Sequence, residues 1–550
     1  MYVRPHWCEE QARSDPHRRP VILCEYAHAM GNSGGSLAAY WQLFRDPNFP
    51  RAQGGFIWDF VDQGLLQSAA SGGDGKTGYA YGGDFGELPN TKQFCCNGIA
   101  GPDRTLFPGA YEAAHLQSPV EVTLLFDHSR DPVLIVTNRA SFGDLSHLRI
   151  IVRPHYHSGR VDHHSGGEAF ELECGPVAAG SFRKLELVEQ LRHSLRFGAV
   201  KIESEAHVGR SVLHFGPAEA WLDVAVVTHP GGCVWHPEPF EVLHTAFTNY
   251  ELRKVFESLV LGAPASIALP PGITRGLSTS TVTSTSCDTS TVGSPFPELS
   301  SDCAEGLPFM TVQVVDDSAQ TLRGVVVRWG DGSVATIGRA CGQLTSWKDR
   351  QGRELLCSTV EPCFYRAGTD NDRGGALLSY YARWKEVGLD RLVCRAQKKA
   401  VISQRRLGCS TPRSHNSKVS AGETAAVEVV TAWVLESPRD AVIKISIRCE
   451  AKYTFSPFGT IDLDFTAEAS DNTPPLARCG LRWAMPREFT SVKYFGLGPH
   501  EAYPDRLASV YLGVFETSVQ AMHTPYTFPQ ECGRRADPRY DNTVKPVYCA

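Results

Sequence analysis

Long apolar runs, a surplus of charge of either sign and closely spaced cysteine pairs are all missing from the sequence. No run reaches the roughly 18 apolar residues that a membrane-spanning helix needs. The formal net charge of −6 gives no electrostatic case for binding nucleic acid or an anionic membrane, so a neutral substrate is expected. No Cys-x-x-Cys pair occurs, which leaves neither a zinc site nor a dithiol redox motif indicated.

The cysteines that are present suggest a reducing compartment. There are 17 of them, an odd number, spread from Cys8 to Cys549. Two interpretations exist, free thiols or a disulfide framework, and the spread favours free thiols. The first ten residues also lack the apolar stretch of a signal peptide. We therefore expect a cytoplasmic protein. Its 550 residues suffice for several domains with large cores.

The first 110 residues show an α/β pattern. Residues 20–24 (Pro-Val-Ile-Leu-Cys) are a short apolar run typical of a strand buried on both faces. Apolar residues at helical spacing follow over 37–44, with Ser33 or Ser36 placed to cap the helix. Residues 54–61 predict a second buried strand. Strand, helix and strand form a βα unit, whose functional residues lie at the carboxyl ends of the strands.

Beyond about residue 118 the pattern becomes that of an all-β protein. Short β-type runs separated by turn residues predict a β-sandwich over 118–240; they lie at 120–126, 132–137, 148–153, 168–173 and 221–228. Similar runs at 311–315, 324–329 and 441–448 predict a larger antiparallel sandwich over 309–550. Between the two, residues 275–302 are rich in Ser and Thr, which predicts a disordered tract within a linker over 241–308.

Glu25 lies at the end of the first predicted strand, where an unpaired carboxylate would lose hydration. One interpretation is a structural carboxylate paired with Arg51 or His28. The other is chemical. His28 follows in the turn, and Trp58 at the end of the second strand offers a flat apolar face to a sugar ring, whose hydroxyls need carboxylate and amide partners. Taken singly, His28 and Trp58 fit a packed core; together with Glu25 they match what a glycosidase needs.

Several longer segments carry a family resemblance. In the first part of the chain they are 20–33, 53–63, 81–90 and 93–98, and in the last part 364–372, 496–506 and 524–529. The chain resembles the bacterial-type β-galactosidases of glycoside hydrolase family 2, a family that also includes β-glucuronidases and β-mannosidases. The matching segments fall in one order over nearly the whole chain and are strongest at 20–110 and 360–530.

The resemblance implies a multidomain fold. Residues 1–117 would be the last two βα units of a (β/α)₈ TIM barrel, and 118–240 an immunoglobulin-like β-sandwich. After the linker at 241–308, residues 309–550 would form a large C-terminal antiparallel β-sandwich similar to galactose mutarotase.

The resemblance also implies an activity, the retaining hydrolysis of terminal non-reducing β-D-galactose residues in β-galactosides such as lactose. It assigns the nucleophile to Glu25. It assigns substrate contacts to four residues, Tyr2, His28, Trp58 and Asn97. It further places a sodium ion on the carbonyl of Phe94 and the side chain of Asn97, oxygen ligands that suit a hard cation.

The sequence departs from the family in ways that bear on activity. Met1 and Tyr2 match a point inside the barrel, before its last two strands. The acid/base glutamate should follow an asparagine, and no Asn-Glu dipeptide occurs. The magnesium ligands of the family have no match, the sodium site is partial, and the match fades after Arg534. We expect this fragment to be inactive by itself, because general acid catalysis contributes about 10²–10⁴-fold.

Other interpretations stay open at this stage. The chain could be a non-catalytic carbohydrate-binding or structural β-sandwich protein. Within the family, the specificity could be that of a β-glucuronidase or β-mannosidase. The partners expected are a β-galactoside substrate, and either a second copy in a homo-oligomer or a complementing N-terminal fragment. Neither nucleic acid nor a membrane is expected.

Overall fold

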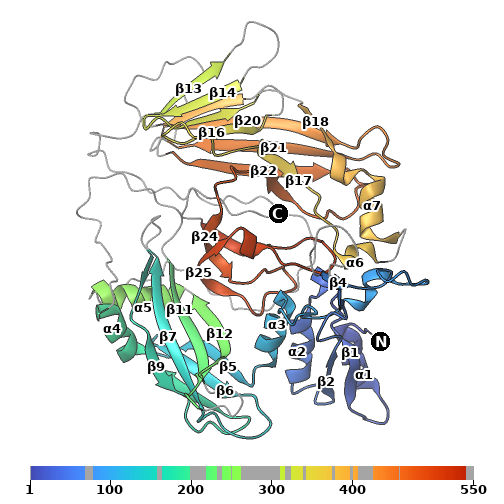
Figure 1. Cartoon of the computed structure of the whole chain (residues 1–550). Coiled ribbons are helices and arrows are strands. Elements are labelled where there is room, and N and C mark those ends of the chain that lie inside the picture. Colours follow the sequence, from blue (N-terminus) through green and yellow to red (C-terminus); the bar gives the residue numbers. More distant parts are fainter. Residues whose placement is uncertain are drawn as a thin grey trace.

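The structure is a computed structural model in three parts (Figure 1). An α/β part lies at the N-terminus, a two-sheet part follows, and a larger β-rich part forms the rest of the chain. The residues that the structure describes are 2–67, 78–157, 164–197, 219–231, 238–248, 250–261, 310–315, 324–338, 342–374, 378–396, 401–406, 425–456 and 459–540.

The N-terminal part is built around two parallel strands. Its elements are α1 (Pro5–Ser14), β1 (Val21–Tyr26), η1 (Gly31–Ser33), α2 (Leu37–Arg45), β2 (Ala52–Ile57), β3 (Leu65–Gln67), β4 (Gly78–Ala80), η3 (Lys92–Cys95) and α3 (Pro108–Gln117). Strands β1 and β2 pair in parallel, and α2 connects them. The apolar face of α2, with Leu37, Tyr40 and Leu43, packs with Leu23 and Tyr26 of β1 in one core. The predicted strand–helix–strand unit is confirmed.

Two local predictions for this part are wrong. The strands are not buried on both faces, since the side chains of Ile22 and Phe56 are 55% and 69% exposed. The reason is that the helices pack on one face of the strand pair. Ser36 occupies the N-cap position of α2 but makes no capping hydrogen bond. The Ser33 hydroxyl accepts instead from the backbone N–H of Asn371, far along the chain.

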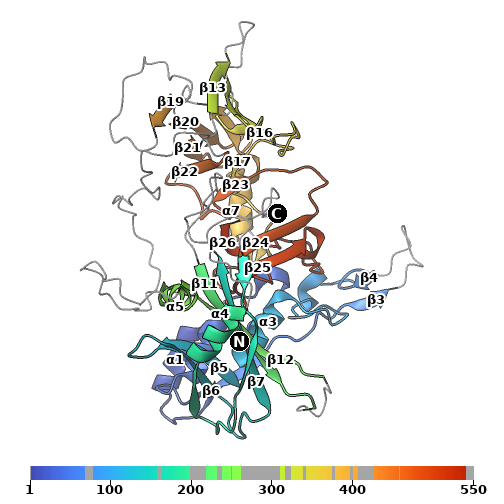
Figure 2. The same cartoon turned by 90° about the vertical axis from the view of Figure 1, so that its left-hand side faces the viewer.

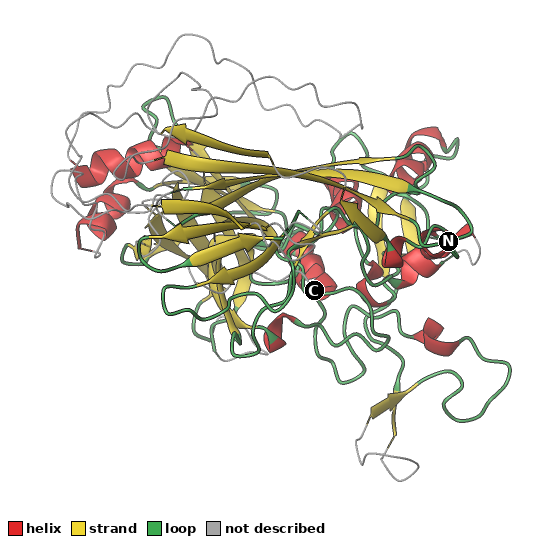
Figure 3. Ribbon diagram, turned by 90° about the horizontal axis from the view of Figure 1, so that it is seen from above, coloured by secondary structure: helices red, strands yellow, loops and turns green. Residues whose placement is uncertain are grey.

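Strands β3 and β4 form a hairpin that extends away from the rest of the molecule (Figures 2 and 3). Its side chains Leu65 and Leu66 point to opposite faces of the ribbon and are both exposed.

The second part is a sandwich of two antiparallel sheets. One sheet holds β5 (Val120–Phe126), β6 (Pro132–Asn138) and β10 (Phe182–Glu186). The other holds β7 (Leu148–His157), β8 (His164–Gly166), β9 (Phe170–Glu173), β11 (Glu219–Thr228) and β12 (Glu241–Thr248). Their inner faces share one apolar core that includes Leu134, Ile150 and Val224. Helices α4 (Val188–Phe197) and α5 (Tyr250–Leu261) contact each other beside this core.

The predicted end of this sandwich at residue 240 is wrong. Strand β12 pairs with β11, and α5 contacts β11, so both elements belong to the sandwich and not to a linker. Buried and exposed side chains do not alternate clearly along β12, since most of them are half-buried. The Ser/Thr-rich tract at 275–302 lies outside the described residues.

The third part contains several antiparallel sheets. One holds β13 (Met310–Val315), β14 (Gly324–Trp329), β15 (Val334–Ile337) and β16 (Leu344–Lys348). A second holds β18 (Val393–Ala396), β19 (Val401–Arg406), β20 (Ala425–Glu436), β21 (Ser446–Phe455) and β22 (Ile461–Ala469). The smaller pairings join β17 (Glu361–Cys363) to β23 (Gly480–Arg482), and β24 (Ser491–Gly498) to β25 (Tyr511–Ser518) and β26 (Ala536–Tyr540). The helical elements are α6 (Asp370–Arg373), α7 (Tyr380–Glu386), η5 (Leu389–Arg391) and η6 (Gln520–Met522).

The predicted antiparallel arrangement of this region is confirmed in the described strands, with one boundary displaced. The strand expected over 441–448 begins at Ser446, because the preceding residues form a turn in which the Ser437 N–H donates to the carbonyl of Ile445. Core side chains from the first two sheets, among them Trp329 and Trp433, share one cluster.

The three parts meet around β24 and β25, which lie between the others in Figure 1. Trp221 of β11 is 1% exposed and packs on Phe495 of β24, with ring centroids 4.9 Å apart. On the other side, Asn32 of the N-terminal part donates to the carbonyl of Glu531. The C-terminal segment therefore reaches the turn that follows β1.

Two sequence expectations concern bulk properties. Each described cysteine is a free thiol, as expected. Within the described ranges, no helix has the length and apolar character needed to cross a membrane.

Candidate active site

Glu25 is the penultimate residue of β1, at the carboxyl end of the strand. Tyr2 lies near its carboxylate, and burial together with the interaction with Glu25 raises the pKa of Tyr2 to about 12. Arg51 does not pair with Glu25. It bonds the carbonyl of Ala12 and lies 3.7 Å from the Asp15 carboxylate. The structural alternative with Arg51 is therefore wrong.

His28 lies beside both residues. Its ring stands edge-on to that of Tyr2, with centroids 4.9 Å apart, and lies 6.0 Å from the ring of Phe94. Burial lowers the pKa of His28, and the charges of Asp59 and Glu25 oppose that shift. A neutral imidazole presents one donor and one acceptor, which suits the hydroxyl groups of a sugar.

Trp58 follows β2 directly and is 36% exposed. Its backbone N–H donates to the carbonyl of Tyr26, which fixes it beside the end of β1. Its indole Nε1 donates to Oδ1 of Asn97 at 3.1 Å, and Nδ2 of Asn97 donates to the Phe94 carbonyl at 2.8 Å. The side chains of Trp58 and Asn97 and the carbonyl of Phe94 thus meet at one end of the strand pair.

The oxygens assigned to sodium have other partners in this arrangement. The Phe94 carbonyl accepts from the Asn97 amide nitrogen, and the Asn97 amide oxygen accepts from Trp58. A cation bound by both oxygens would need the Asn97 amide to turn, which would place its NH₂ group against the indole N–H. Among the described residues, no group of three or more His, Cys, Asp and Glu side chains is placed to hold a metal. The sodium site stays a prediction.

Asp59 is a site residue to which the sequence pattern gave no role. Its Oδ2 accepts from Gln63, while its buried Oδ1 has no hydrogen-bond partner in the described part of the chain. Its negative charge acts on both Tyr2 and His28. Asp59 was visible in the sequence as the residue after Trp58, but its proximity to Tyr2 and His28 depends on tertiary structure.

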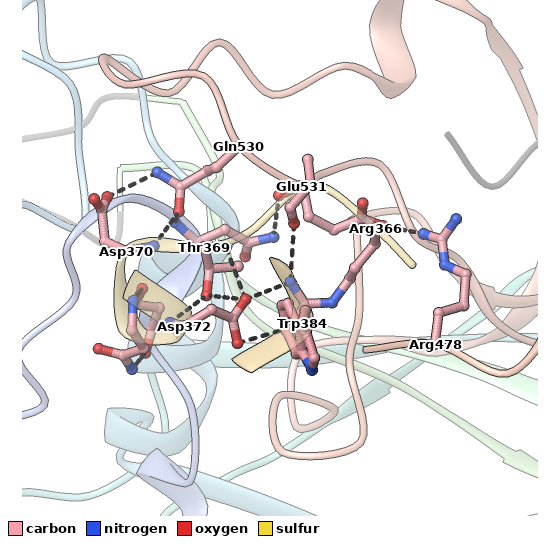
Figure 4. Close-up of polar contacts among 12 residues, drawn as sticks. Arg366, Thr369, Asp370, Asp372, Trp384, Arg478, Gln530 and Glu531 are labelled. Carbon is pink, nitrogen blue, oxygen red and sulfur yellow. Dashed lines mark hydrogen bonds and ion pairs between the residues drawn. The ribbon is translucent and has the colours of Figure 1, made fainter. Parts of the chain in front are cut away.

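Figure 4 shows a polar network in the third part of the chain, which reaches the residue before Phe94 through a hydrogen bond from Gln93 to Asp370. Thr369 and Asp372 form a capping box at the start of α6, and Arg366 pairs with Asp372 at 2.6 Å. Asp370 of the same helix bonds the side chain of Gln530 at 2.9 Å. In the sequence, the residues at 366–372 were visible only as part of a family motif and Gln530 belonged to none, because contacts between distant segments leave no local signal.

Two models of known protein families match parts of the chain. The model for the TIM barrel domain of family 2 glycosyl hydrolases matches residues 2–122. The model for the β-galactosidase small chain matches residues 330–544.

Three bacterial proteins named β-galactosidase are similar to nearly the whole chain. That of Klebsiella pneumoniae is 31% identical over 97% of this chain and 42% of its own length. That of Aeromonas hydrophila is 31% identical over 95% of this chain and 40% of its own length. That of Photobacterium profundum is 30% identical over 98% of this chain and 43% of its own length. The chain therefore spans about two-fifths of the relatives that it matches. The chain is thus similar to bacterial β-galactosidases, and its two ends match models of glycosyl hydrolase family 2 and of the β-galactosidase small chain.

Proposed function

We propose that Glu25 is the nucleophile in the retaining hydrolysis of terminal β-D-galactosides such as lactose. The observation that carries the proposal is the place of Glu25 at the carboxyl end of β1, with Trp58 directly after β2 and the ring of His28 4.9 Å from that of Tyr2. The relatives are named β-galactosidases, which supports galactose over glucuronic acid or mannose.

The residues have separate tasks in this proposal. The Glu25 carboxylate attacks the anomeric carbon and forms a glycosyl-enzyme, which water then hydrolyses. Tyr2 lies near this carboxylate, and in this proposal its hydroxyl donates to one oxygen and so orients the other for attack. Trp58 supplies an apolar face for the C–H side of the sugar ring, and the neutral His28 exchanges hydrogen bonds with its hydroxyls.

Retaining hydrolysis also needs a carboxylic acid about 5–5.5 Å from the nucleophile to protonate the leaving oxygen. The 550-residue sequence has no Asn-Glu dipeptide to supply the family's acid/base glutamate. We propose that these residues alone turn over lactose poorly. Full activity would then require further barrel strands packed against the exposed side chains of Ile22 and Phe56. The free thiols fit the reducing cytoplasm.

A reagent whose leaving group needs no proton tests the nucleophile by itself. With 2,4-dinitrophenyl 2-deoxy-2-fluoro-β-D-galactoside, a Glu25 oxygen bonds to the anomeric carbon while dinitrophenolate departs with the electron pair. We expect one fluorogalactosyl group per chain, on the peptide that contains Glu25, detected by mass spectrometry. The Glu25→Gln variant should not be labelled, and the corresponding glucuronide and mannoside should label more slowly.

Labelling that persists in Glu25→Gln would refute the nucleophile assignment. Absence of labelling, combined with galactose binding that Glu25→Gln leaves unchanged, would favour a non-catalytic carbohydrate-binding protein.

A further inference from the structure

Two segments carry residues of the proposed galactoside site, and we call them its two walls. Both are hydrogen-bonded to the same pair of residues in the third part of the chain. The first wall is the turn at 28–33, which follows the strand of Glu25. The second is the segment at 91–97, which carries Phe94 and Asn97. The pair consists of Gln530 and Asp370 (Figure 4).

Gln530 bonds the first wall. Its Oε1 accepts from the backbone N–H of Asn32 at 2.9 Å and from that of Asp370 at 3.3 Å. Its Nε2 donates to Oδ2 of Asp370 at 2.9 Å and to the carbonyl of Phe528 at 3.0 Å. All hydrogen-bonding positions of this amide are thus directed at backbone groups or at Asp370, which fixes its orientation.

Asp370 bonds the second wall. Its Oδ1 accepts from Nε2 of Gln93 at 3.1 Å, and Gln93 directly precedes Phe94. Each carboxylate oxygen of Asp370 therefore serves one glutamine, Gln93 or Gln530. Asp370 is itself held at the start of α6, where Thr369 and Asp372 form the capping box.

The first wall is seated firmly against this region. Asn32 is buried, and its Nδ2 donates to the Tyr503 hydroxyl at 2.9 Å while its Oδ1 accepts from Arg506 at 2.7 Å. At Gly31, φ is +51°, and a Cβ there would overlap the side chain of Gln530. The glycine of this turn is therefore explained by both its backbone conformation and the close approach of Gln530.

We propose that Gln530 and Asp370 are positioning residues that set the separation between the two walls, and through it the placement of Glu25 and His28 against Trp58 and Asn97. The inference rests on the proposed function. Neither residue needs to touch the sugar. Reactive groups tolerate little displacement, and a shift of about 1 Å can lower a rate by about 100-fold.

The hydrogen-bond pattern suggests a set of variants. Asp370→Asn leaves one of the two glutamine NH₂ groups facing another donor, and Gln530→Glu places two carboxylates together. In the double variant, the new amide of residue 370 can donate to the new carboxylate of residue 530 and still accept from Gln93. The double variant still lacks the hydrogen bond from residue 530 to the Phe528 carbonyl. It should therefore restore only part of the parent's labelling rate. Asn138→Ala is the matched control, since Asn138 is a buried asparagine that bonds the carbonyls of Gly143 and Val177 in the distant sandwich.

The first measurement is the rate of labelling by the dinitrophenyl fluorogalactoside, at a temperature where all variants are folded. We expect each single variant to lower the maximal rate about 10- to 100-fold, with a smaller change in the reagent concentration at half-maximal rate. The double variant should recover part of the rate, and Asn138→Ala should keep the parent rate. Equal losses in Asn138→Ala and in the single variants would contradict positioning, because the loss would then follow stability alone.

The second measurement is amide hydrogen exchange, which does not depend on catalysis. Gln530→Glu and Asp370→Asn should speed exchange in peptides covering 28–33 and 91–97, whereas Asn138→Ala should change neither. Parent-like exchange in both peptides overturns the inference whatever the labelling shows. If the parent chain is not labelled while the variants show faster exchange in both walls, the proposed function fails and the coupling of the walls stands.

Discussion

The ring of Tyr2 stands edge-on to that of His28, with centroids 4.9 Å apart, and so joins the start of the described chain to the turn after β1. Burial and the nearby carboxylate of Glu25 raise the pKa of the Tyr2 hydroxyl to about 12. Tyr2 therefore lies beside two groups of the candidate site, and in the proposed reaction its hydroxyl donates to the carboxylate. A hydrogen bond to an ionised carboxylate is among the stronger polar interactions in proteins.

Replacing Tyr2 by Phe should slow labelling of Glu25 by about 10- to 100-fold, since hydrogen bonds to charged groups contribute about 1.5–3 kcal/mol. The ring, and with it the contact to His28, is retained. Mass spectrometry of the dinitrophenyl fluorogalactoside reaction gives the rates. Tyr79→Phe, a half-exposed tyrosine on the β3–β4 hairpin, is the control and should match the parent. Equal rates in both variants would show that Tyr2 does not orient the nucleophile.

Local patterns predicted the frame of the site well. The apolar run before Glu25 and the helical spacing over 37–44 are properties of neighbouring residues, and both produced the expected elements, β1 and α2. The carboxyl ends of parallel strands meet at one edge, so Glu25 and Trp58 could be placed together before any contact was known.

Contacts between distant segments could not be predicted in the same way. Gln530 is a polar residue in a loop, and such residues are mostly solvated; its bond to the Asn32 backbone joins positions 498 residues apart. The strand β12 was missed for a related reason. Its half-buried side chains give little alternation, and its membership follows from pairing with β11.

His244 of β12 should make stability depend on pH. Its ring lies 2.5 Å from the Asp223 carboxylate and 3.0 Å from that of Glu241, and it stacks on Tyr511 of β25 at 4.1 Å. Burial alone would lower the pKa of His244, but the hydrogen bonds and charges of the two carboxylates prevail and raise it from 6.5 to about 9. The folded chain thus binds this proton more tightly than the unfolded chain does.

The sign follows from linkage. Because the folded pKa is the higher one, the stabilisation is fully present below about pH 6.5 and is lost as the pH rises through about 9. Urea unfolding at pH 6, 7.5 and 9.5 gives the free energy of unfolding of the parent and of His244→Gln. The difference between the two should shrink as the pH rises. The upper bound of this difference is about 3.5 kcal/mol, since each pKa unit corresponds to about 1.4 kcal/mol. His128→Gln, an exposed histidine in a turn, should track the parent at every pH. A constant gap between parent and His244→Gln would count against a charged His244.

Glu501 and Arg506 form an ion pair at 2.8 Å, with side chains only 1% and 4% exposed. Glu501 also accepts from the hydroxyl of Tyr526 at 2.6 Å, and Arg506 also donates to Asn32 at 2.7 Å. Removing either charge leaves the other buried without its partner, which costs about 3–5 kcal/mol. We expect Glu501→Gln and Arg506→Met each to lower the urea midpoint strongly. The double variant should lose less than the sum of the two.

An exposed pair supplies the comparison for this prediction. Arg448 and Glu468 lie 3.4 Å apart with side chains 73% and 77% exposed, and such pairs contribute about 0–1 kcal/mol because water screens them. Arg448→Met and Glu468→Gln should therefore hardly move the midpoint. Added salt should weaken the exposed pair and leave the buried one nearly unchanged, since screening requires access to ions. Similar losses of stability from the buried and the exposed pair would contradict this prediction. So would full additivity of Glu501→Gln and Arg506→Met, because it would mean that the two buried charges do not depend on each other.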